Sequence, residues 1–285
     1  MLHLSDDAKL QREVATVRLD ADIDYEGLLE SNKDLKINMG ISSIIGTRQY
    51  QQDTVFGHSD TNSTLAIVCD GMGGLTGGER ASQTATQTLA EDYFNRDKTI
   101  PIPEFFRQEA IKMDEAVHSL VDEEGNFLDA GTTCVATIIE GNKLYWLSVG
   151  DSKIYIIRDN EIMAVNREHN YRLRLDDRLK RGLITPEEYK AEEAQAEALI
   201  SYIGIGNVSL MDINQQPFEL LEDDVVLLCS DGLYKRLNDL ELLELIKYEL
   251  PDVNRAAKRL TDVVIKRTTK AQDNTSLVLL QYSKY

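Results

Sequence analysis

The sequence predicts an α+β fold in which layers of β-strands are covered by pairs of helices. Strand-like and helix-like segments occur in separate blocks, and the helical segments come in pairs, which is typical of a layered α+β domain. The chain has 285 residues, of which 42% are hydrophobic. This is enough for a substantial core, in one large domain or two small ones. The sequence contains no internal repeat and no low-complexity tract.

The expected strands are short runs of aliphatic and β-branched residues that begin at residue 37. Turn residues at 140–142 and 159–160 separate three consecutive strand segments, so a meander of antiparallel strands is the simplest interpretation of that region. The expected strands cover residues 37–45, 63–69, 132–140, 141–149, 152–165, 211–220, 224–230 and 274–283.

The expected helices of the layers form two pairs, covering residues 78–94, 103–124, 238–250 and 252–269. A polar, charged and helix-prone segment at about 168–205 interrupts the strands. Within it, Thr185 and Pro186 are a helix cap and a first-turn proline. We interpret this segment as an inserted helical flap, although a solvated hairpin without a functional role accounts for it equally well.

The N-terminal 36 residues are acidic and only weakly periodic, and we predict that residues 1–36 form an arm. A docked helix, a regulatory arm and a frayed tail all fit its sequence. The first residues are too polar for a signal peptide, and no apolar run approaches the length of a membrane span. With a formal net charge of −18, the chain is expected to bind neither nucleic acid nor an anionic membrane.

Three cysteines, Cys69, Cys134 and Cys229, lie inside apolar runs without CxxC or Cys/His spacing. We expect them to be small buried residues in a reduced compartment, which places the chain in the cytoplasm.

Five aspartates lie where a strand-like run meets a loop, and four of them have glycine or another small residue beside them. Carboxylate oxygens suit Mg²⁺ or Mn²⁺, and strands hold their ends more rigidly than loops do. The sequence therefore predicts a site for a hard cation, built from Asp53, Asp70, Asp151, Asp231 and Asp273.

A glycine-rich segment follows Asp70 in the sequence VCDGMGGLTGGERAS (68–82). We expect Gly71, Gly73 and Gly74 to let the backbone turn tightly after a strand and to let a carbonyl approach a metal ion. The segment lacks the GxxxxGK[ST] pattern, so a P-loop is not expected. Taken singly, this motif and the other Asp-Gly motifs are also explained by ordinary turns.

In their order along the chain, six motifs resemble the PPM family of metal-dependent protein serine/threonine phosphatases, also called type 2C. They are RQYQQD, DGMGG followed by GE, GTT, GDSKIY, SDGL and DN, and they span residues 48–274. The resemblance implies that residues 37–285 form a phosphatase domain with two packed antiparallel sheets, flanked by pairs of helices. GLITPEE (182–188) resembles the flap of bacterial members.

The resemblance also implies how the carboxylates share two tightly bound ions, either Mg²⁺ or Mn²⁺. Asp70 would bridge both ions, and the Gly71 carbonyl would bind one of them. Asp231 and Asp273 would complete the shell of the first ion, while Asp53 would support the second.

Other residues carry further implied roles. Asp151 would help to bind a third, weaker ion, Arg48 would grip the substrate phosphate, and Asn274 would support the site from behind the ligands. Met72 replaces the histidine of many eukaryotic relatives, as in bacterial members. Lys153 replaces the usual arginine, which keeps the charge and loses the planar fork.

The implied chemistry is phosphoester hydrolysis without a protein nucleophile. Two divalent ions that share a carboxylate lower the pKa of a bridging water, which attacks phosphorus in line, and they neutralise the phosphoryl oxygens. A guanidinium adds bidentate contacts to the phosphate.

The leading hypothesis is a phosphatase acting on phosphoserine and phosphothreonine in proteins, with a role in signalling. Its expected partners are phosphorylated proteins and a cognate serine/threonine kinase, and we expect a monomer. Two alternatives stay open: a catalytically inactive regulator that binds phosphoproteins or a kinase, and a phosphoesterase that acts on small molecules.

Overall fold

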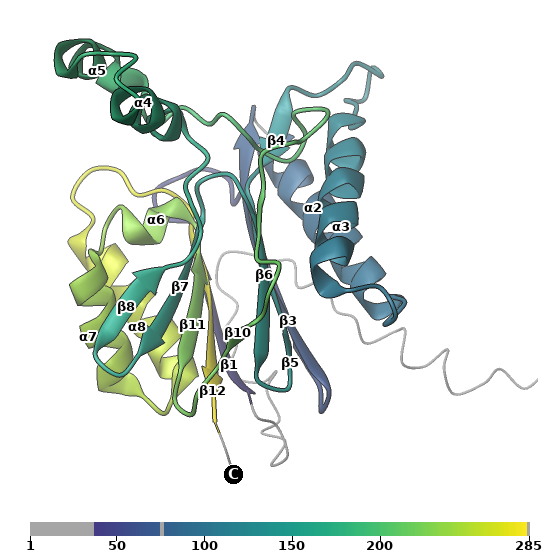
Figure 1. Ribbon diagram of the computed structural model, residues 1–285, viewed down its shortest axis with the longest axis vertical. Helices are drawn as coiled ribbons and strands as arrows, with labels where there is room; N and C mark the ends of the chain where they lie inside the picture. Colours follow the sequence, from purple (N-terminus) through teal and green to yellow (C-terminus); the bar gives the residue numbers. More distant parts are fainter. Residues whose placement is uncertain (1–36, 75–76, 284–285) are drawn as a thin grey trace, which may run out of the picture.

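The computed structural model describes residues 37–74 and 77–283, so the predicted arm at 1–36 lies outside the described residues. Two antiparallel β-sheets lie face to face at the centre, and helices cover the outer face of each sheet (Figure 1). This arrangement confirms the predicted α+β sandwich. The three cysteines are buried and free, as expected.

One sheet has five antiparallel strands in the order β1-β12-β11-β7-β8, so the last strand along the chain lies beside the first. β1 and β12 pair over their full length, from Ile37 opposite Tyr282 to Ile44 opposite Thr275. The strands are β1 (Ile37–Ile44), β7 (Lys153–Arg158), β8 (Glu161–Ala164), β11 (Val225–Cys229) and β12 (Thr275–Tyr282).

The other sheet has seven strands, of which five follow the order β10-β6-β5-β3-β2, while β4 pairs with β3 and β9 with β6. Its longest strand, β3, has partners on both edges. The strands are β2 (Asp53–Ser59), β3 (Ser63–Gly73), β4 (Ala130–Thr132), β5 (Cys134–Glu140), β6 (Lys143–Val149), β9 (Asp212–Ile213) and β10 (Phe218–Glu219).

Two helices cover the seven-stranded sheet and three cover the five-stranded sheet (Figure 1). The first group is α2 (Gly77–Phe94) and α3 (Ile102–His118), and the second is α6 (Asp231–Tyr234), α7 (Asp239–Glu249) and α8 (Val253–Arg267). In the part of the chain that the structure describes, none of the helices is both long and apolar enough to span a membrane.

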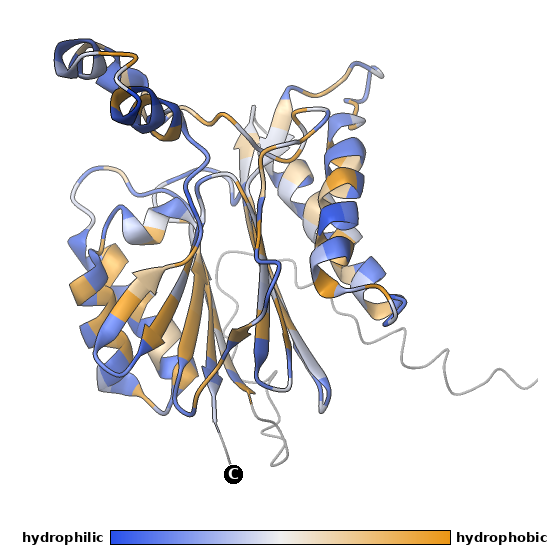
Figure 2. Ribbon diagram, viewed as in Figure 1, coloured by the Kyte–Doolittle hydropathy of each residue, from blue (hydrophilic) through white to orange (hydrophobic). Residues whose placement is uncertain are grey.

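Successive side chains of β12 pack into different layers of the core, because both faces of its sheet are covered. Leu277 and Leu279 pack under α7 and α8, whereas Val278 and Leu280 pack between the two sheets. Figure 2 shows the result, with strongly hydrophobic strands at the centre of the molecule.

The flap segment forms α4 (Tyr171–Lys180), α5 (Pro186–Glu192) and a 3₁₀ turn at Glu193–Gln195, and it projects from one end of the sandwich (Figure 1). The predicted cap is present: Thr185 Oγ1 accepts from the Glu188 backbone N–H, and the Glu188 side chain accepts from the Thr185 backbone N–H. The flap has a small core around Leu175 and Ile184, but its surface is mostly hydrophilic (Figure 2).

The predicted meander at 132–165 is wrong in one respect. β5 and β6 form one hairpin and β7 and β8 form another, but the two hairpins belong to different sheets. The chain crosses between the sheets at Gly150, whose φ of 100° is a backbone conformation that favours glycine. The crossing places the next residue, Asp151, where the two sheets meet.

Two further boundaries differ from the sequence prediction. The helix predicted to reach residue 124 ends at His118, because Val121 pairs with Phe127 and the chain reverses at Gly125. The strand predicted at 211–220 is divided into β9 and β10, since the Asn214 side chain accepts from the Trp146 backbone N–H and takes the place of a strand partner there.

Candidate active site

The aspartates that begin β2 and lie near the end of β3 face each other across the seven-stranded sheet. Asp53 is directly opposite Asp70 in the strand register, where paired residues have Cβ atoms about 4.5–5.5 Å apart. Asp53 is 4% exposed. Two buried or half-buried carboxylates are thus held side by side by backbone pairing alone.

The glycine after Asp70 does not turn the chain, contrary to the sequence prediction. β3 continues to Gly73, and its last three residues pair with β4. Gly71 is required by close packing instead, because a Cβ at this position would lie 2.0 Å from the Gly78 carbonyl oxygen and 2.6 Å from that of Gln52. These contacts hold Asp70 between the start of α2 and the start of β2.

The backbone of Asp70 is also fixed from the β4 side. Its carbonyl oxygen accepts from the Thr133 backbone N–H at 2.8 Å and from Thr132 Oγ1 at 2.9 Å, and its N–H donates to Thr133 Oγ1 at 3.0 Å. The predicted GTT motif therefore contributes to the site by positioning Asp70.

The other three aspartates come from the crossing point and from the five-stranded sheet. Asp151 is 7% exposed, and its carbonyl oxygen accepts from Tyr234 Oη at 3.1 Å. Asp231 begins α6 directly after β11, and Asp273 lies two residues before β12. The structure thus brings together all five aspartates that the sequence singled out.

Their mutual repulsion shows in the pKa of Asp70. Burial raises it well above the ordinary value, and the charges of the other four aspartates raise it further. Burial likewise raises the pKa of Asp53 to about 7 and that of Asp151 to about 6, with the charge of Asp231 adding to both. The centre is a concentration of negative charge that a bound cation would relieve.

The donor set fits hard divalent cations. Asp53 Oδ1 and Asp231 Oδ1 are buried and have no hydrogen-bond partner among the described residues, which is costly unless something else binds them. Within 37–74 and 77–283, no three His, Cys, Asp or Glu side chains form a ready-made ligand cluster. Mg²⁺ commonly uses only one or two carboxylates and keeps several waters.

Among the residues that the structure describes, two basic side chains pair with these carboxylates. Arg48 Nη2 lies 2.5 Å from Asp273 Oδ2, and the Arg48 side chain is 59% exposed. Lys235 Nζ lies 2.6 Å from Asp231 Oδ2 and 4.0 Å from Asp151 Oδ2. Arg48 therefore lies at the edge of the acidic centre, open to solvent and to a ligand.

Asn274 has a positioning role in the structure. Its Nδ2 donates to the carbonyl oxygens of Ile45 and Tyr50, and its Oδ1 accepts from the Gln52 backbone N–H. These three bonds fix the loop that carries Arg48. Asn274 is 5% exposed, so its side chain is occupied with the loop.

Sequence reasoning missed two residues of the centre. Ser230 Oγ donates to Asp53 Oδ2 at 2.8 Å and links the two sheets. Lys235 follows the SDGL motif in the sequence SDGLYKRL (230–237), and its spacing of four residues from Asp231 is the signal that would have placed the two side chains together. The other motif lysine, Lys153, pairs with Glu168 at the base of the flap at 2.8 Å.

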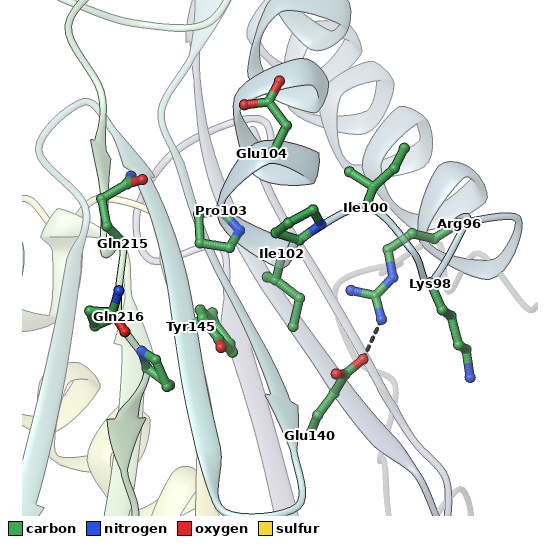
Figure 3. Close-up of a pocket in the computed structure, with 12 residues that line it drawn as sticks. Arg96, Lys98, Ile100, Ile102, Pro103, Glu104, Glu140, Tyr145, Gln215 and Gln216 are labelled. Carbon is green, nitrogen blue, oxygen red and sulfur yellow. Dashed lines mark hydrogen bonds and ion pairs between the residues drawn. The ribbon is translucent and has the colours of Figure 1, made fainter.

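A pocket of about 450 Å³ lies at the other end of the seven-stranded sheet, between the α2–α3 corner and residues 215–217 (Figure 3). None of the five aspartates lines it. Arg96 is its most buried charged group, with a side chain only 4% exposed, paired with Glu140 and placed over the rings of Tyr93 and Phe105. Arg96 thus links the α2–α3 corner to the end of β5 through its ion pair with Glu140.

Comparison with known proteins finds similarity over most of the chain. The family model described as protein phosphatase 2C matches residues 42–278. The serine/threonine phosphatase stp of Listeria welshimeri is 25% identical over 241 residues, which are 82% of this chain and 91% of that protein.

Solved structures show the same similarity in three dimensions. The crystal structure of the Mycobacterium tuberculosis serine/threonine phosphatase PstP/Ppp has a TM-score of 0.71 at 26% identity, and the match covers 87% of this chain and 99% of that chain. The catalytic domain of PstP in complex with two manganese ions has a TM-score of 0.68 at 26% identity, over the same two shares.

Proposed function

The chain belongs to the protein phosphatase 2C family and is a metal-dependent serine/threonine phosphatase, and we propose that its five converging aspartates are the centre of that activity. The single observation that supports this assignment best is the convergence itself. Asp53 lies opposite Asp70 in paired strands, and Ser230, the residue before Asp231, donates to Asp53. Lys235 lies near both Asp231 and Asp151. The charge of Asp273 adds to the effect of burial in raising the pKa of Asp53 and that of Asp70.

Asp70 and Asp53 would hold the ions from the seven-stranded sheet, and Asp231 and Asp273 from the five-stranded sheet. When bound, two divalent ions supply an activated water and neutralise charge on the phosphoryl group. The two unpartnered oxygens, Asp53 Oδ1 and Asp231 Oδ1, support this division, because each sheet offers one. We propose Mn²⁺ or Mg²⁺ as the ion, since both prefer oxygen ligands.

Arg48 would bind the substrate phosphate at the exposed edge of the centre. Its guanidinium is planar and can contact two phosphoryl oxygens at once. The loop that carries it is fixed by Asn274, so the guanidinium is held near the carboxylates before a substrate arrives. We propose phosphoserine and phosphothreonine in proteins as substrates, because the related proteins of Listeria welshimeri and Mycobacterium tuberculosis are named serine/threonine phosphatases.

The deciding assay measures Mn²⁺-dependent turnover of p-nitrophenyl phosphate and of a phosphothreonine peptide. We expect Asp70→Asn and Asp231→Asn each to reduce kcat by at least about 10²-fold, because each removes a charged ion ligand. Glu222→Gln is the matched control. It removes one exposed carboxylate from the loop that precedes β11, at the end of the strand opposite to Asp231, and it should leave kcat unchanged.

The remaining outcomes separate the alternatives. If wild type shows no turnover but binds phosphoproteins tightly, the chain is a binding regulator and the proposed activity is wrong. Turnover of p-nitrophenyl phosphate without turnover of phosphopeptides would instead indicate a phosphoesterase for small molecules.

A further inference from the structure

Lys235 pairs with an aspartate of the proposed metal centre, and the roles implied for the aspartates do not explain this contact. It caps the short helix α6, where its backbone N–H donates to the Asp231 carbonyl oxygen at 3.0 Å. A spacing of four residues places the two side chains on the same side of this turn. As a result, Lys235 Nζ lies 2.6 Å from Asp231 Oδ2.

The same ammonium group reaches a second carboxylate, from another part of the fold. Asp151 Oδ2 lies 4.0 Å from Lys235 Nζ, and the Asp151 side chain is 10% exposed. Asp151 belongs to the crossing between the sheets, whereas Asp231 follows β11. β7 and β11 are paired, with Cys229 opposite Lys153, so Asp151 and Asp231 each lie two residues beyond the same end of this pair. Lys235 is thus a cation between two carboxylates at the end of paired strands.

The Lys235 side chain is 46% exposed, so its ammonium group contacts solvent as well as the two carboxylates. The neighbouring Lys153 is engaged elsewhere, because it pairs with Glu168 and lies over the Tyr234 ring.

The two oxygens of Asp231 have different surroundings. Oδ2 accepts from Lys235, whereas Oδ1 is buried and has no partner among the described residues. Asp231 can therefore offer Oδ1 to an ion of the two-ion centre while Oδ2 keeps the lysine. Among the described ion pairs, the partner of Asp151 is Lys235, which lies 4.0 Å from Asp151 Oδ2.

We propose that Lys235 is a built-in cation that takes the place of a third divalent ion between Asp151 and Asp231, so that this enzyme holds two ions. The proposal rests on the proposed function, because it assumes that the two-ion centre is real. The family resemblance implies a third, weaker ion beside Asp151. In the proposal, the Lys235 side chain takes the place of that ion. Lys235 is accordingly a positioning residue that holds Asp151 and Asp231 together.

The test is the number of Mn²⁺ ions that the full chain binds, measured by calorimetry and by electron paramagnetic resonance of the free ion. Wild type should bind two ions. Lys235→Met keeps the length of the side chain and removes its charge, so it should bind a third ion, with a Kd at least about tenfold below the highest free Mn²⁺ concentration at which wild type still binds two. The double variant Lys235→Met/Asp151→Asn should return to two.

Two controls keep the result interpretable. Lys153→Met removes an adjacent lysine that pairs with Glu168, and it should stay at two ions. Lys235→Gln is measured beside Lys235→Met, and thermal melting in chelator checks that both fold; if neither does, the wild-type count alone decides.

Each count has one meaning. A wild type that binds three ions, or a folded Lys235→Met that still binds two, overturns the role of Lys235 while the proposed function stands. A wild type that binds no ion overturns both.

Discussion

Single carboxylates of the centre should make the protein more stable as the pH falls, provided that no metal is present. The folded pKa of Asp53 is about 7, raised by burial and then by neighbouring charge above its ordinary value of 3.8. Between those two values the folded state binds more protons than the unfolded state, so the stability contributed at low pH is lost as the pH rises through 7. Asp151, with a pKa of about 6, acts in the same direction.

We therefore expect the free energy of unfolding in chelator to be larger at pH 5.5 than at pH 8, by an amount on the order of 2 kcal/mol. Urea denaturation at the two pH values measures it. Glu109, whose pKa is also about 7, contributes to the same slope, so the comparison is made with Asp53→Asn. If the free energy of unfolding of Asp53→Asn changes between pH 5.5 and pH 8 as much as that of wild type does, the effect does not come from Asp53.

Arg48 should matter for its shape as well as its charge. Arg48→Lys keeps a cation beside Asp273 and loses the planar pair of donors, so we expect kcat/KM for a phosphopeptide to fall by about tenfold or more. Steady-state kinetics with saturating Mn²⁺ measures this. Arg107→Lys on the exposed face of α3, where Arg107 pairs with Glu104, is the matched control. Equal kinetics for Arg48→Lys and wild type would mean that Arg48 does not bind the phosphate.

At the scale of elements, one buried carboxylate supports the loop that follows the flap. Asp114 on α3 is 2% exposed and accepts from the backbone N–H groups of Gly204, Gly206 and Val208 at 2.7, 3.2 and 2.9 Å. Asp114→Ala leaves three donors without their acceptor, and we expect it to cost about 2–4 kcal/mol of stability. Urea denaturation measures the loss. A cost below about 1 kcal/mol would show that water replaces the carboxylate.

The flap should be removable without unfolding the sandwich. Its two ends are adjacent: the Tyr171 backbone N–H donates to the Ala198 carbonyl oxygen at 2.8 Å, and Asn170 pairs with Leu199. The small core around Leu175 consists only of residues of the flap. Replacing residues 172–197 by Asn-Gly, which closes a hairpin, should change the melting temperature by only a few degrees.

The flap lies close enough to the centre for the charge of Glu197 to act on Lys235. We therefore expect the flap deletion to keep turnover of p-nitrophenyl phosphate within about threefold and to raise KM for a phosphopeptide by about tenfold. Unchanged KM values for both substrates would favour the solvated hairpin without a functional role.

The sequence predicts where these elements begin and end better than it predicts which strands pair with each other. Thr185 and Pro186 mark the start of α5 correctly, because a capping box depends on residues three apart. The crossing at Gly150 was not predictable, since a strand does not record in its own residues which sheet it joins. The contacts of Ser230 with Asp53 and of Lys235 with Asp151 depend on such long-range placement. The strand-end pattern predicted a cation site at the five aspartates, whereas their separate roles came only from the family resemblance.

For the whole molecule, bound ions should join the two sheets. The aspartates of the centre come from both of them, so ions that bind the folded state stabilise the entire sandwich. At a free Mn²⁺ concentration about 100 times the Kd, one site adds about 2.7 kcal/mol. Thermal melting should shift upward by several degrees between chelator and Mn²⁺. The double variant Asp70→Asn/Asp231→Asn should show almost no shift, and a shift as large as that of wild type would place the ions elsewhere.

The pairing of β12 with β1 has a consequence for synthesis. β12 is buried along its whole length between β1 and β11, and Asp273 and Asn274 come immediately before it. A ribosome makes this strand more than two hundred residues after β1, so a nascent chain holds an open sheet edge until then. We therefore expect no phosphatase activity before β12 has joined the sheet. Truncation before residue 273 removes Asp273, Asn274 and β12, and it should leave an inactive chain.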